Sequence, residues 1–211
     1  MSIRPPAEAY EKVPTVIFPD SAKAAKTLAQ EVKLLIETKN QAGKPAVLGM
    51  ATGSTPVPFY RELIRLHKEE GLSFHNVVTF NLDEYYPIPR ENQQSYWRFM
   101  HEYLFDHIDI PKENIHIPDG TIPMEEVEAY CERYEKLIDL AGGIDIQLLG
   151  IGRTGHIGFN EPGAWEQSLT RMVRLDNLTR RDAVKDFGLE QNVPYRAITM
   201  GIATIFKARQ V

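Results

Sequence analysis

The residues most suited to chemistry gather in one glycine-rich segment, residues 150–163, with the sequence GIGRTGHIGFNEPG. His156 is followed by Glu161 in this segment, and such a carboxylate can orient an imidazole and tune its charge for proton transfer. The glycines allow the backbone to bend sharply and to approach a ligand closely. A lone histidine is usually structural, but this flexible setting favours a proton-transfer role for His156. Arg153 could neutralise Glu161, bind an anionic ligand or lie in solvent.

A second candidate segment, residues 51–55, joins a predicted strand to a helix that is expected to begin near Pro56. Free backbone N–H groups at a helix N-terminus, together with the hydroxyls of Thr52, Ser54 and Thr55, would form a suitable phosphate site. A tight turn with a capping hydroxyl explains the same residues equally well. The segment lacks the Gly-Lys-Ser/Thr ending of a Walker A loop.

The third candidate is an acidic pair, Asp83 and Glu84, at the end of a predicted strand. Adjacent strand side chains point to opposite faces, so only one of the two can enter a cleft directly. A carboxylate that Tyr85 or Tyr86 partly desolvates there would have a raised pKa and could act as a base. The alternative is a solvated acidic pair, which is the commoner state of such residues.

Hydrophobic periodicity predicts the elements that must position these segments. Strands are expected at residues 15–18, 46–50, 76–82, 144–149 and 196–201, and helices from 21 to before 43 and at 56–70, 96–107, 124–140 and 180–187. This alternation predicts an α/β fold: a doubly wound, mostly parallel, Rossmann-like sheet with helices on both faces. Ligands bind such sheets at the carboxyl ends of the strands. Residues 51–55, 83–86 and 150–163 are predicted to be loops that leave strands at that edge, and they are therefore expected to meet there.

Composition limits the classes of function. The chain has 211 residues, 43% hydrophobic and 25% charged, and is expected to form one domain over residues 13–211 after a polar extension over residues 1–12. The net charge of −5 comes from interspersed acids and bases, which predicts no nucleic-acid and no membrane partner. Cys131 is the only cysteine, so a cytoplasmic location without an internal disulfide is expected. The six histidines show no paired ligand spacing, so no metal is expected.

Four segments together resemble the glucosamine-6-phosphate deaminase family. They are residues 48–56 (LGMATGSTP), 78–85 (VTFNLDEY), 95–101 (SYWRFMH) and 155–162 (GHIGFNEP). The resemblance extends from about Val47 to the C-terminus. It implies conversion of glucosamine 6-phosphate and water into fructose 6-phosphate and ammonia, without a metal or an organic cofactor. It also implies a small sugar-phosphate partner and a homo-oligomer.

The resemblance assigns roles to residues of this chain. Asp83 matches the family's acid–base aspartate, which moves a proton between C2 and C1 of the sugar. His156 matches the histidine that transfers a proton to or from the ring oxygen, and Glu161 matches the carboxylate that orients it. The expected phosphate ligands are Thr52, Gly53, Ser54, Thr55 and Lys185. Anchoring the phosphate would position the reacting carbon for proton transfer.

Three departures from the family pattern affect these expectations. Thr154 stands where better-known members carry an aspartate, and the missing charge beside the imidazole predicts slower ring opening. Lys185 replaces the usual arginine and lacks its planar fork, so Arg180 or Arg181 could assist. The family continues through another strand and helix beyond the position of Val211. We therefore expect a fold truncated at its C-terminal end and a weakly active or inactive fragment, from a parent that could carry a second enzymatic domain.

Two alternatives to a deaminase stay open. A 6-phosphogluconolactonase-like hydrolase would share the scaffold, but the Asp83–Glu84 pair and residues 159–162 favour the deaminase. A non-catalytic sugar-phosphate sensor would be stabilised by its ligand without turnover. Arg171 matches one basic position of the effector site of regulated members, whereas Val173 replaces a second, which argues against effector regulation.

Overall fold

The computed structural model describes residues 13–211 and confirms the α/β class predicted from the sequence. The main sheet has four parallel strands in the order β4–β2–β1–β5, and a smaller antiparallel sheet has the order β3–β7–β6. The main strands are β1 (Ala46–Met50), β2 (Val77–Asn81), β4 (Ile115–His116) and β5 (Ile146–Gln147). The others are β3 (Asp83–Tyr86), β6 (Arg171–Arg174) and β7 (Arg196–Thr199).

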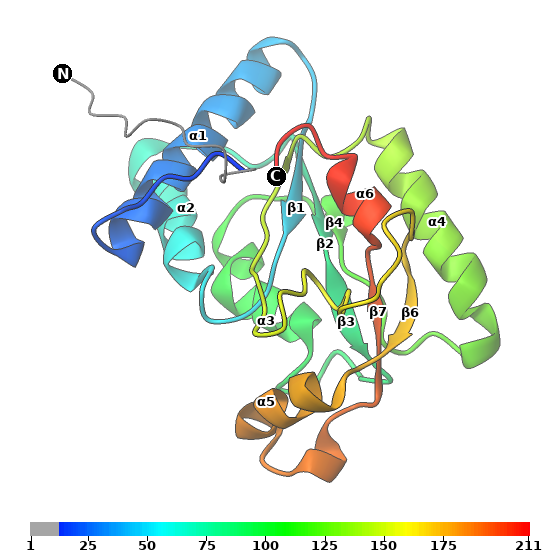
Figure 1. The fold of residues 1–211 in the computed structure, drawn as a ribbon. Coiled ribbons are helices and arrows are strands. Elements are labelled where there is room, and N and C mark those ends of the chain that lie inside the picture. The colour runs from blue at the N-terminus through cyan, green and yellow to red at the C-terminus, as the bar shows by residue number, and fades with distance from the viewer. Residues whose placement is uncertain (1–12) are drawn as a thin grey trace.

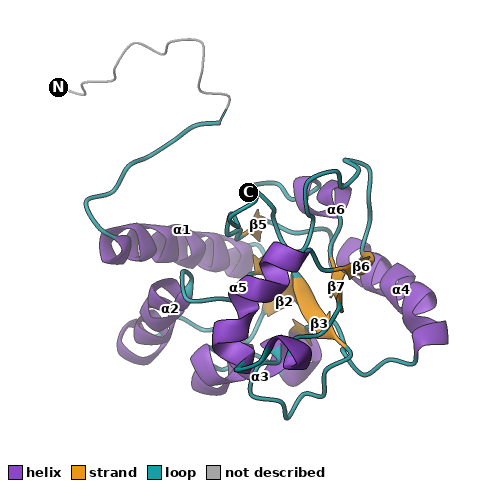
Figure 2. Ribbon diagram, turned by 60° about the horizontal axis from the view of Figure 1, so that its bottom comes forward, coloured by secondary structure: helices purple, strands orange, loops and turns teal. Residues whose placement is uncertain are grey.

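Helices cover both faces of the main sheet, as a doubly wound fold requires. They are α1 (Ser21–Gln41), α2 (Val57–Glu70), α3 (Tyr96–Tyr103), α4 (Val127–Leu140), α5 (Asn177–Phe187) and α6 (Ile202–Phe206). Side chains of β1 alternate between two cores because successive residues of a strand point to opposite faces. Leu48 and Met50 share a core with α1, α2 and α3, whereas Val47 shares one with α4 and α6. In Figure 1, α1 and α2 lie to the left of the sheet and α4 and α6 to its right, and Figure 2 shows strands enclosed by helices.

The helix starts follow from the local sequence. Asp20 accepts a hydrogen bond from the backbone N–H of Lys23 at the start of α1, and Ser95 accepts one from Arg98 at the start of α3. These are the side-chain caps expected for Asp and Ser. The apolar stripe predicted on the fourth helix is buried along α4, at Val127, Cys131, Tyr134 and Ile138.

The small sheet corrects the prediction for two segments. Residues 83–86 are not a loop but form β3, and the strand predicted at 196–201 pairs antiparallel with β3 instead of joining the parallel sheet. The two sheets meet at Leu82, whose N–H donates to the carbonyl of Met50 and whose carbonyl accepts from the N–H of Met200. Because Leu82 is bonded to both sides, the chain passes from β2 into β3 without a loop.

Other expectations are wrong in detail. Residues 15–18 form no strand, and the 73% and 91% exposure of Val16 and Ile17 shows that no burial favours pairing there. The strand predicted at 144–149 is regular only over β5, and residues 148–149 connect β5 to the glycine-rich segment. The short strands β4 and β6 show too little periodicity to be predicted.

The third predicted helix also ends early. α3 stops at Tyr103, and a 3-10 turn follows over Phe105–His107. Further 3-10 turns cover Lys112–Asn114, Met124–Glu126 and Glu190–Asn192. Within residues 13–211, none of the helices combines the length and the apolar character needed to cross a membrane.

Candidate active site

The carboxyl end of β1 leads directly into residues 51–55, the predicted phosphate loop. The fully buried Tyr60 of α2 donates a hydrogen bond from its hydroxyl to the carbonyl of Ala51, so the start of this loop is held against α2. A cavity of about 610 Å³ lies beside the loop, between α2, α3 and α5. Gly53 and Ser54 line it, and so does Lys185 from the last turn of α5.

The structure therefore brings together three of the five expected phosphate ligands around one cavity. Thr52 does not line the cavity, and it forms a hydrogen bond with Tyr96 that opposes the rise in the pKa of Tyr96 caused by burial. Thr55 is exposed and does not line the cavity. A lysine facing a helix N-terminus offers an anion both a full positive charge and free N–H donors.

Three side chains of the glycine-rich segment form a hydrogen-bonded relay. The Thr154 hydroxyl donates to Oε2 of Glu161 at 2.8 Å and lies 2.8 Å from Nδ1 of His156, which is 3.2 Å from the same Glu161 oxygen. The Glu161 carboxylate can only accept, and the Thr154 hydroxyl already donates its proton to that carboxylate. Nδ1 of His156 must therefore be the donor in these contacts, which assigns the imidazole proton to Nδ1. Nε2 of His156 is then the free nitrogen, with a lone pair available for proton transfer.

Gly152 makes room for this histidine. A Cβ at Gly152 would lie 2.1 Å from Nε2 and 2.3 Å from Cε1 of His156, so any other residue would displace the ring. The Nε2–Cε1 edge of the imidazole therefore packs against the bare backbone of Gly152, which helps to fix the position of the ring. The His156 side chain keeps 18% of its surface exposed.

The glycine-rich segment meets Asp83 at Gly158. A Cβ there would lie 3.4 Å from Oδ2 of Asp83 and 2.8 Å from Oγ1 of Thr199, and Gly158 has a φ of +55° that favours glycine. The Thr199 hydroxyl accepts a hydrogen bond from the N–H of Phe159 at 3.1 Å, and Thr199 pairs with Asp83 between β7 and β3. The acid and the histidine segment are therefore held against each other by the small sheet.

Asp83 is 7% exposed. Burial, followed by the charge of Glu84, raises the pKa of Asp83 to about 8. Desolvation destabilises the charged form of a carboxylate, so this acid holds its proton at neutral pH more strongly than an ordinary aspartate. Such a group can both give and take a proton near neutral pH.

Glu84 has a different function from its neighbour, as the strand alternation predicts. Its carboxylate accepts 2.9 Å hydrogen bonds from the backbone N–H groups of Tyr85, Tyr96 and Trp97. It therefore caps the start of α3, where a negative charge is favoured by the helix dipole. Burial raises the pKa of Glu84 to about 7, and these three donors oppose the rise.

Tyr96 is a cavity residue that the sequence did not single out, because aromatic residues at helical spacing, as in residues 96–105, are more often used for core packing. It lines the cavity with Tyr85. Burial, and then the charges of Tyr85 and Asp83, raise the pKa of Tyr96 well above its ordinary value, while a hydrogen bond with Thr52 opposes this. Tyr96 thus lies between the phosphate loop and the buried acid. The available signal was its place in residues 95–101, one of the segments that carry the family resemblance.

Arg180 does not assist at the phosphate cavity. Its guanidinium stacks on the Tyr195 ring at 3.7 Å and donates to the carbonyls of Glu190 and Val193. The side chain is buried in this contact, so it stabilises the turn after α5. Arg153 forms an exposed 3.0 Å ion pair with Asp182 of α5 rather than neutralising Glu161.

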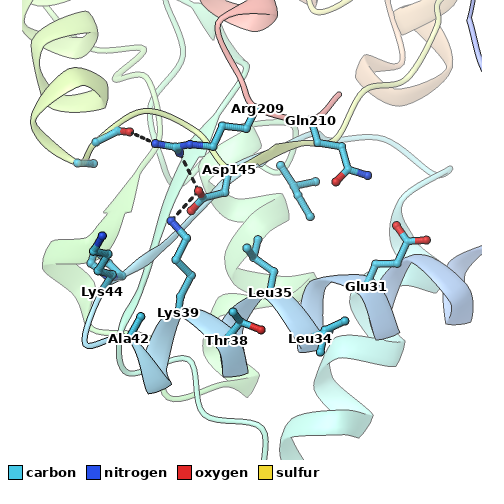
Figure 3. A pocket seen from close by; sticks show the side chains of 14 residues that line it. Glu31, Leu34, Leu35, Thr38, Lys39, Ala42, Lys44, Asp145, Arg209 and Gln210 are labelled. Carbon is cyan, nitrogen blue, oxygen red and sulfur yellow. Dashed lines mark hydrogen bonds and ion pairs between the residues drawn. The ribbon is translucent and has the colours of Figure 1, made fainter.

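A second hollow, of about 1100 Å³, lies at the opposite end of the main sheet between α1 and β5. Figure 3 shows Asp145 at its centre, between Lys39 and Arg209. Both cations lie 2.7 Å from Oδ1 of Asp145, and the N–H of Val47 donates to Oδ2. Every oxygen of this acid is engaged, so the hollow contains no free acid–base group at its centre. Within residues 13–211, no cluster of three His, Cys, Asp or Glu residues is arranged to hold a metal ion.

Comparison with known proteins identifies the family. The profile of the glucosamine-6-phosphate isomerases/6-phosphogluconolactonase family matches residues 19–211. The glucosamine-6-phosphate deaminase of Shouchella clausii is 49% identical over 184 residues, covering 87% of this chain and 74% of that protein. The chain therefore belongs to the glucosamine-6-phosphate isomerase/6-phosphogluconolactonase family, which confirms the resemblance stated above.

Two more comparisons define how far the likeness extends. A glucosamine-6-phosphate deaminase-like protein of Bacteroides thetaiotaomicron is 48% identical over 201 residues, and the chain covers 30% of its length. A solved structure described as a monomeric glucosamine-6-phosphate deaminase superposes with a TM-score of 0.84 at 44% identity, covering 90% of this chain and 76% of that one. The 6-phosphogluconolactonase from Trypanosoma brucei shares the fold alone, with a TM-score of 0.71 at 20% identity over 93% of this chain and 80% of that one.

Proposed function

We propose that this chain catalyses the isomerising deamination of glucosamine 6-phosphate with water to fructose 6-phosphate and ammonia, as part of amino-sugar catabolism. The observation that carries the proposal is the contact at Gly158, which joins the buried acid Asp83 to the segment of the His156 relay. Tyr96 lines the cavity together with Gly53 and Ser54, and after burial the charges of Tyr85 and Asp83 contribute to its raised pKa. The identity to named deaminases supports the same conclusion.

The substrate phosphate would bind at the cavity beside α2 and α5. Gly53, Ser54 and Lys185 line it and would supply backbone N–H donors and an ammonium group, and Thr52 and Thr55 would offer hydroxyls from the same loop. A dianion fixed by several donors loses most of its freedom, which leaves the sugar ring correctly placed for reaction at its other end. Lysine provides charge without the bidentate geometry of arginine, so we expect weaker phosphate affinity than an arginine would give.

His156 would open the pyranose ring. Its free Nε2 exchanges a proton with the ring oxygen, while Nδ1–H remains bonded to Thr154 and Glu161. The Glu161 carboxylate stabilises the positive charge that the ring acquires when Nε2 is protonated. Thr154 supplies a hydrogen bond but no charge at this position.

Asp83 would then move the proton in the open-chain sugar. Its carboxylate takes the C2 proton and returns it to C1, while a proton passes from the amino nitrogen to O1, and the two transfers together convert the amino aldose into the imine of fructose 6-phosphate. Water adds to that imine, and ammonia leaves. The raised pKa of Asp83 suits both halves of this transfer, because a base with a pKa near the working pH can also release the proton again.

Assembly and location complete the proposal. Family resemblance favours a homo-oligomer, although the solved relative at 44% identity is described as monomeric, so the mass of the chain in solution decides between the two.

The Bacteroides relative is much longer than the matched part, and a second enzymatic domain in a parent of this chain is a further proposal. The single, buried Cys131 suits a cytoplasmic protein.

The test is ammonia release from glucosamine 6-phosphate by the 211-residue chain, measured together with the appearance of fructose 6-phosphate. We expect both products in equal amounts, and Asp83→Asn to abolish them. Acid release from 6-phosphogluconolactone without ammonia would instead identify a lactonase. Thermal stabilisation by the sugar phosphate with no product of either kind would identify a sensor, and both results would contradict the proposal.

A further inference from the structure

The two oxygens of Glu161 have different partners. Oε2 faces the relay, at 3.2 Å from Nδ1 of His156 and 2.8 Å from the Thr154 hydroxyl. Oε1 accepts a hydrogen bond from the hydroxyl of Thr179, which belongs to α5. Glu161 is largely buried, with 17% of its side chain exposed, so its carboxylate is held from both sides by protein groups.

The terminal torsion of a glutamate is soft, and a carboxylate rotates easily about it. With only the relay as partner, Glu161 could turn either oxygen, or neither, toward Nδ1. A donor fixed on a helix removes that freedom, because it holds one oxygen and thereby directs the other. The exposed ion pair between Arg153 and Asp182, at 3.0 Å, is a second contact between α5 and the same segment.

We propose that Thr179 is a positioning residue that holds Glu161 in the orientation that keeps the His156 proton on Nδ1. The inference rests on the proposed role of His156 in proton transfer. Thr179 does not need to touch the substrate, since it acts through Glu161 alone. Its removal should therefore slow the proton-transfer step while leaving phosphate binding intact.

The kinetic test compares Thr179→Val, which keeps the shape of the side chain, with Thr179→Ser, which keeps the hydroxyl. We expect kcat for ammonia release to fall roughly tenfold to a hundredfold in the valine variant, the scale of one hydrogen bond to a charged group, with KM nearly unchanged. The serine variant should recover most of the activity. Thr204→Val is the matched control, because Thr204 also donates to a carboxylate, that of Glu135 at 2.6 Å, outside the site. It should keep its kcat.

A second measurement does not depend on turnover. Nitrogen-15 NMR of the His156 ring reports which nitrogen carries the proton. We expect the Nδ1–H tautomer in the wild type, and a shift toward Nε2–H in Thr179→Val but not in Thr179→Ser. If the wild type releases no ammonia, the proposed function fails, and the NMR comparison still decides the role of Thr179.

A double-mutant cycle with Glu161→Gln completes the design. If Thr179 acts through Glu161, the valine substitution costs little more in that background, because coupled residues are not additive. An unchanged tautomer in Thr179→Val would overturn the proposal. A kcat loss in Thr179→Val that is fully additive with that of Glu161→Gln would also overturn the proposal, because Thr179 would then not act through Glu161. An equal kcat loss in Thr204→Val would overturn it too, because it would indicate general destabilisation.

Discussion

Replacing the buried Asp83 by asparagine, its neutral isostere, should change the free energy of unfolding by an amount that depends on pH in a defined direction. Burial raises the pKa of Asp83 to about 8 from an ordinary value of 3.8, so between these pH values the folded chain holds a proton that the unfolded chain has lost. Stability from this group is fully present below about pH 4 and is lost as the pH rises to about 8. Asp83→Asn is neutral throughout and escapes this loss.

The size of the effect follows from the same shift. Each pH unit in this window costs the wild type about 1.4 kcal/mol relative to Asp83→Asn, hence about 2.7 kcal/mol between pH 5 and pH 7. For a domain of about this size, that amounts to a relative shift of roughly 5 to 10 °C in Tm. The variant should therefore gain on the wild type as the pH rises, although it loses at least a hundredfold in ammonia release.

The assay is differential scanning fluorimetry of both proteins at pH 5, 6, 7 and 8. Asp139→Asn, on the exposed surface of α4, serves as the control and should keep a constant Tm difference from the wild type. If the Tm difference between wild type and Asp83→Asn is the same at every pH, the burial argument for Asp83 is refuted. The same carboxylate must lose its proton to act as a base, so kcat/KM should rise with pH and level off above about 8.

Three further substitutions test individual parts of the site. Thr154→Asp adds a charge beside Nδ1 of His156, and we expect kcat to rise severalfold; an unchanged turnover would show that this position does not limit the reaction. Lys185→Arg should lower KM through a bidentate phosphate contact, whereas Lys185→Ala should raise it by tenfold or more with a smaller change in kcat. Gly158→Ala should cost about 1–3 kcal/mol of stability and most of the activity, because its Cβ meets Thr199; wild-type kinetics would contradict the close contact with Asp83.

Sequence periodicity predicted the central strands β1 and β2 and the helices around them because those elements carry regular apolar patterns. Leu48 and Val47 show this directly, since their alternation assigns them to opposite cores. The reversal at Leu82 left no such signal. Its hydrogen bonds to Met50 and Met200 depend on a strand far away in the chain, and a tertiary pairing of this kind overrides local preference.

The candidate site likewise contains residues that the sequence indicates and residues that only the fold brings together. His156 and Glu161 were predicted as partners because they lie close in sequence within one segment. Thr179 and Tyr96 were not, because their contacts with Glu161 and Thr52 join separate helices to distant loops. Arg180 shows the opposite case. It lies on α5 together with Lys185, but its guanidinium stacks on the Tyr195 ring and is not available to the phosphate. Proximity in the chain identifies a relay, whereas the residues that hold it emerge only from the fold.

The most direct test of the central claim is a crystal structure of the chain with a reduced, open-chain analogue of glucosamine 6-phosphate. The account predicts one bound molecule, with its phosphate against Gly53, Ser54 and Lys185. The Asp83 carboxylate should reach its C2, and Nε2 of His156 should reach the hydroxyl that corresponds to the ring oxygen. A phosphate bound elsewhere, or an analogue that touches Asp83 while His156 faces a different cavity, would contradict the account.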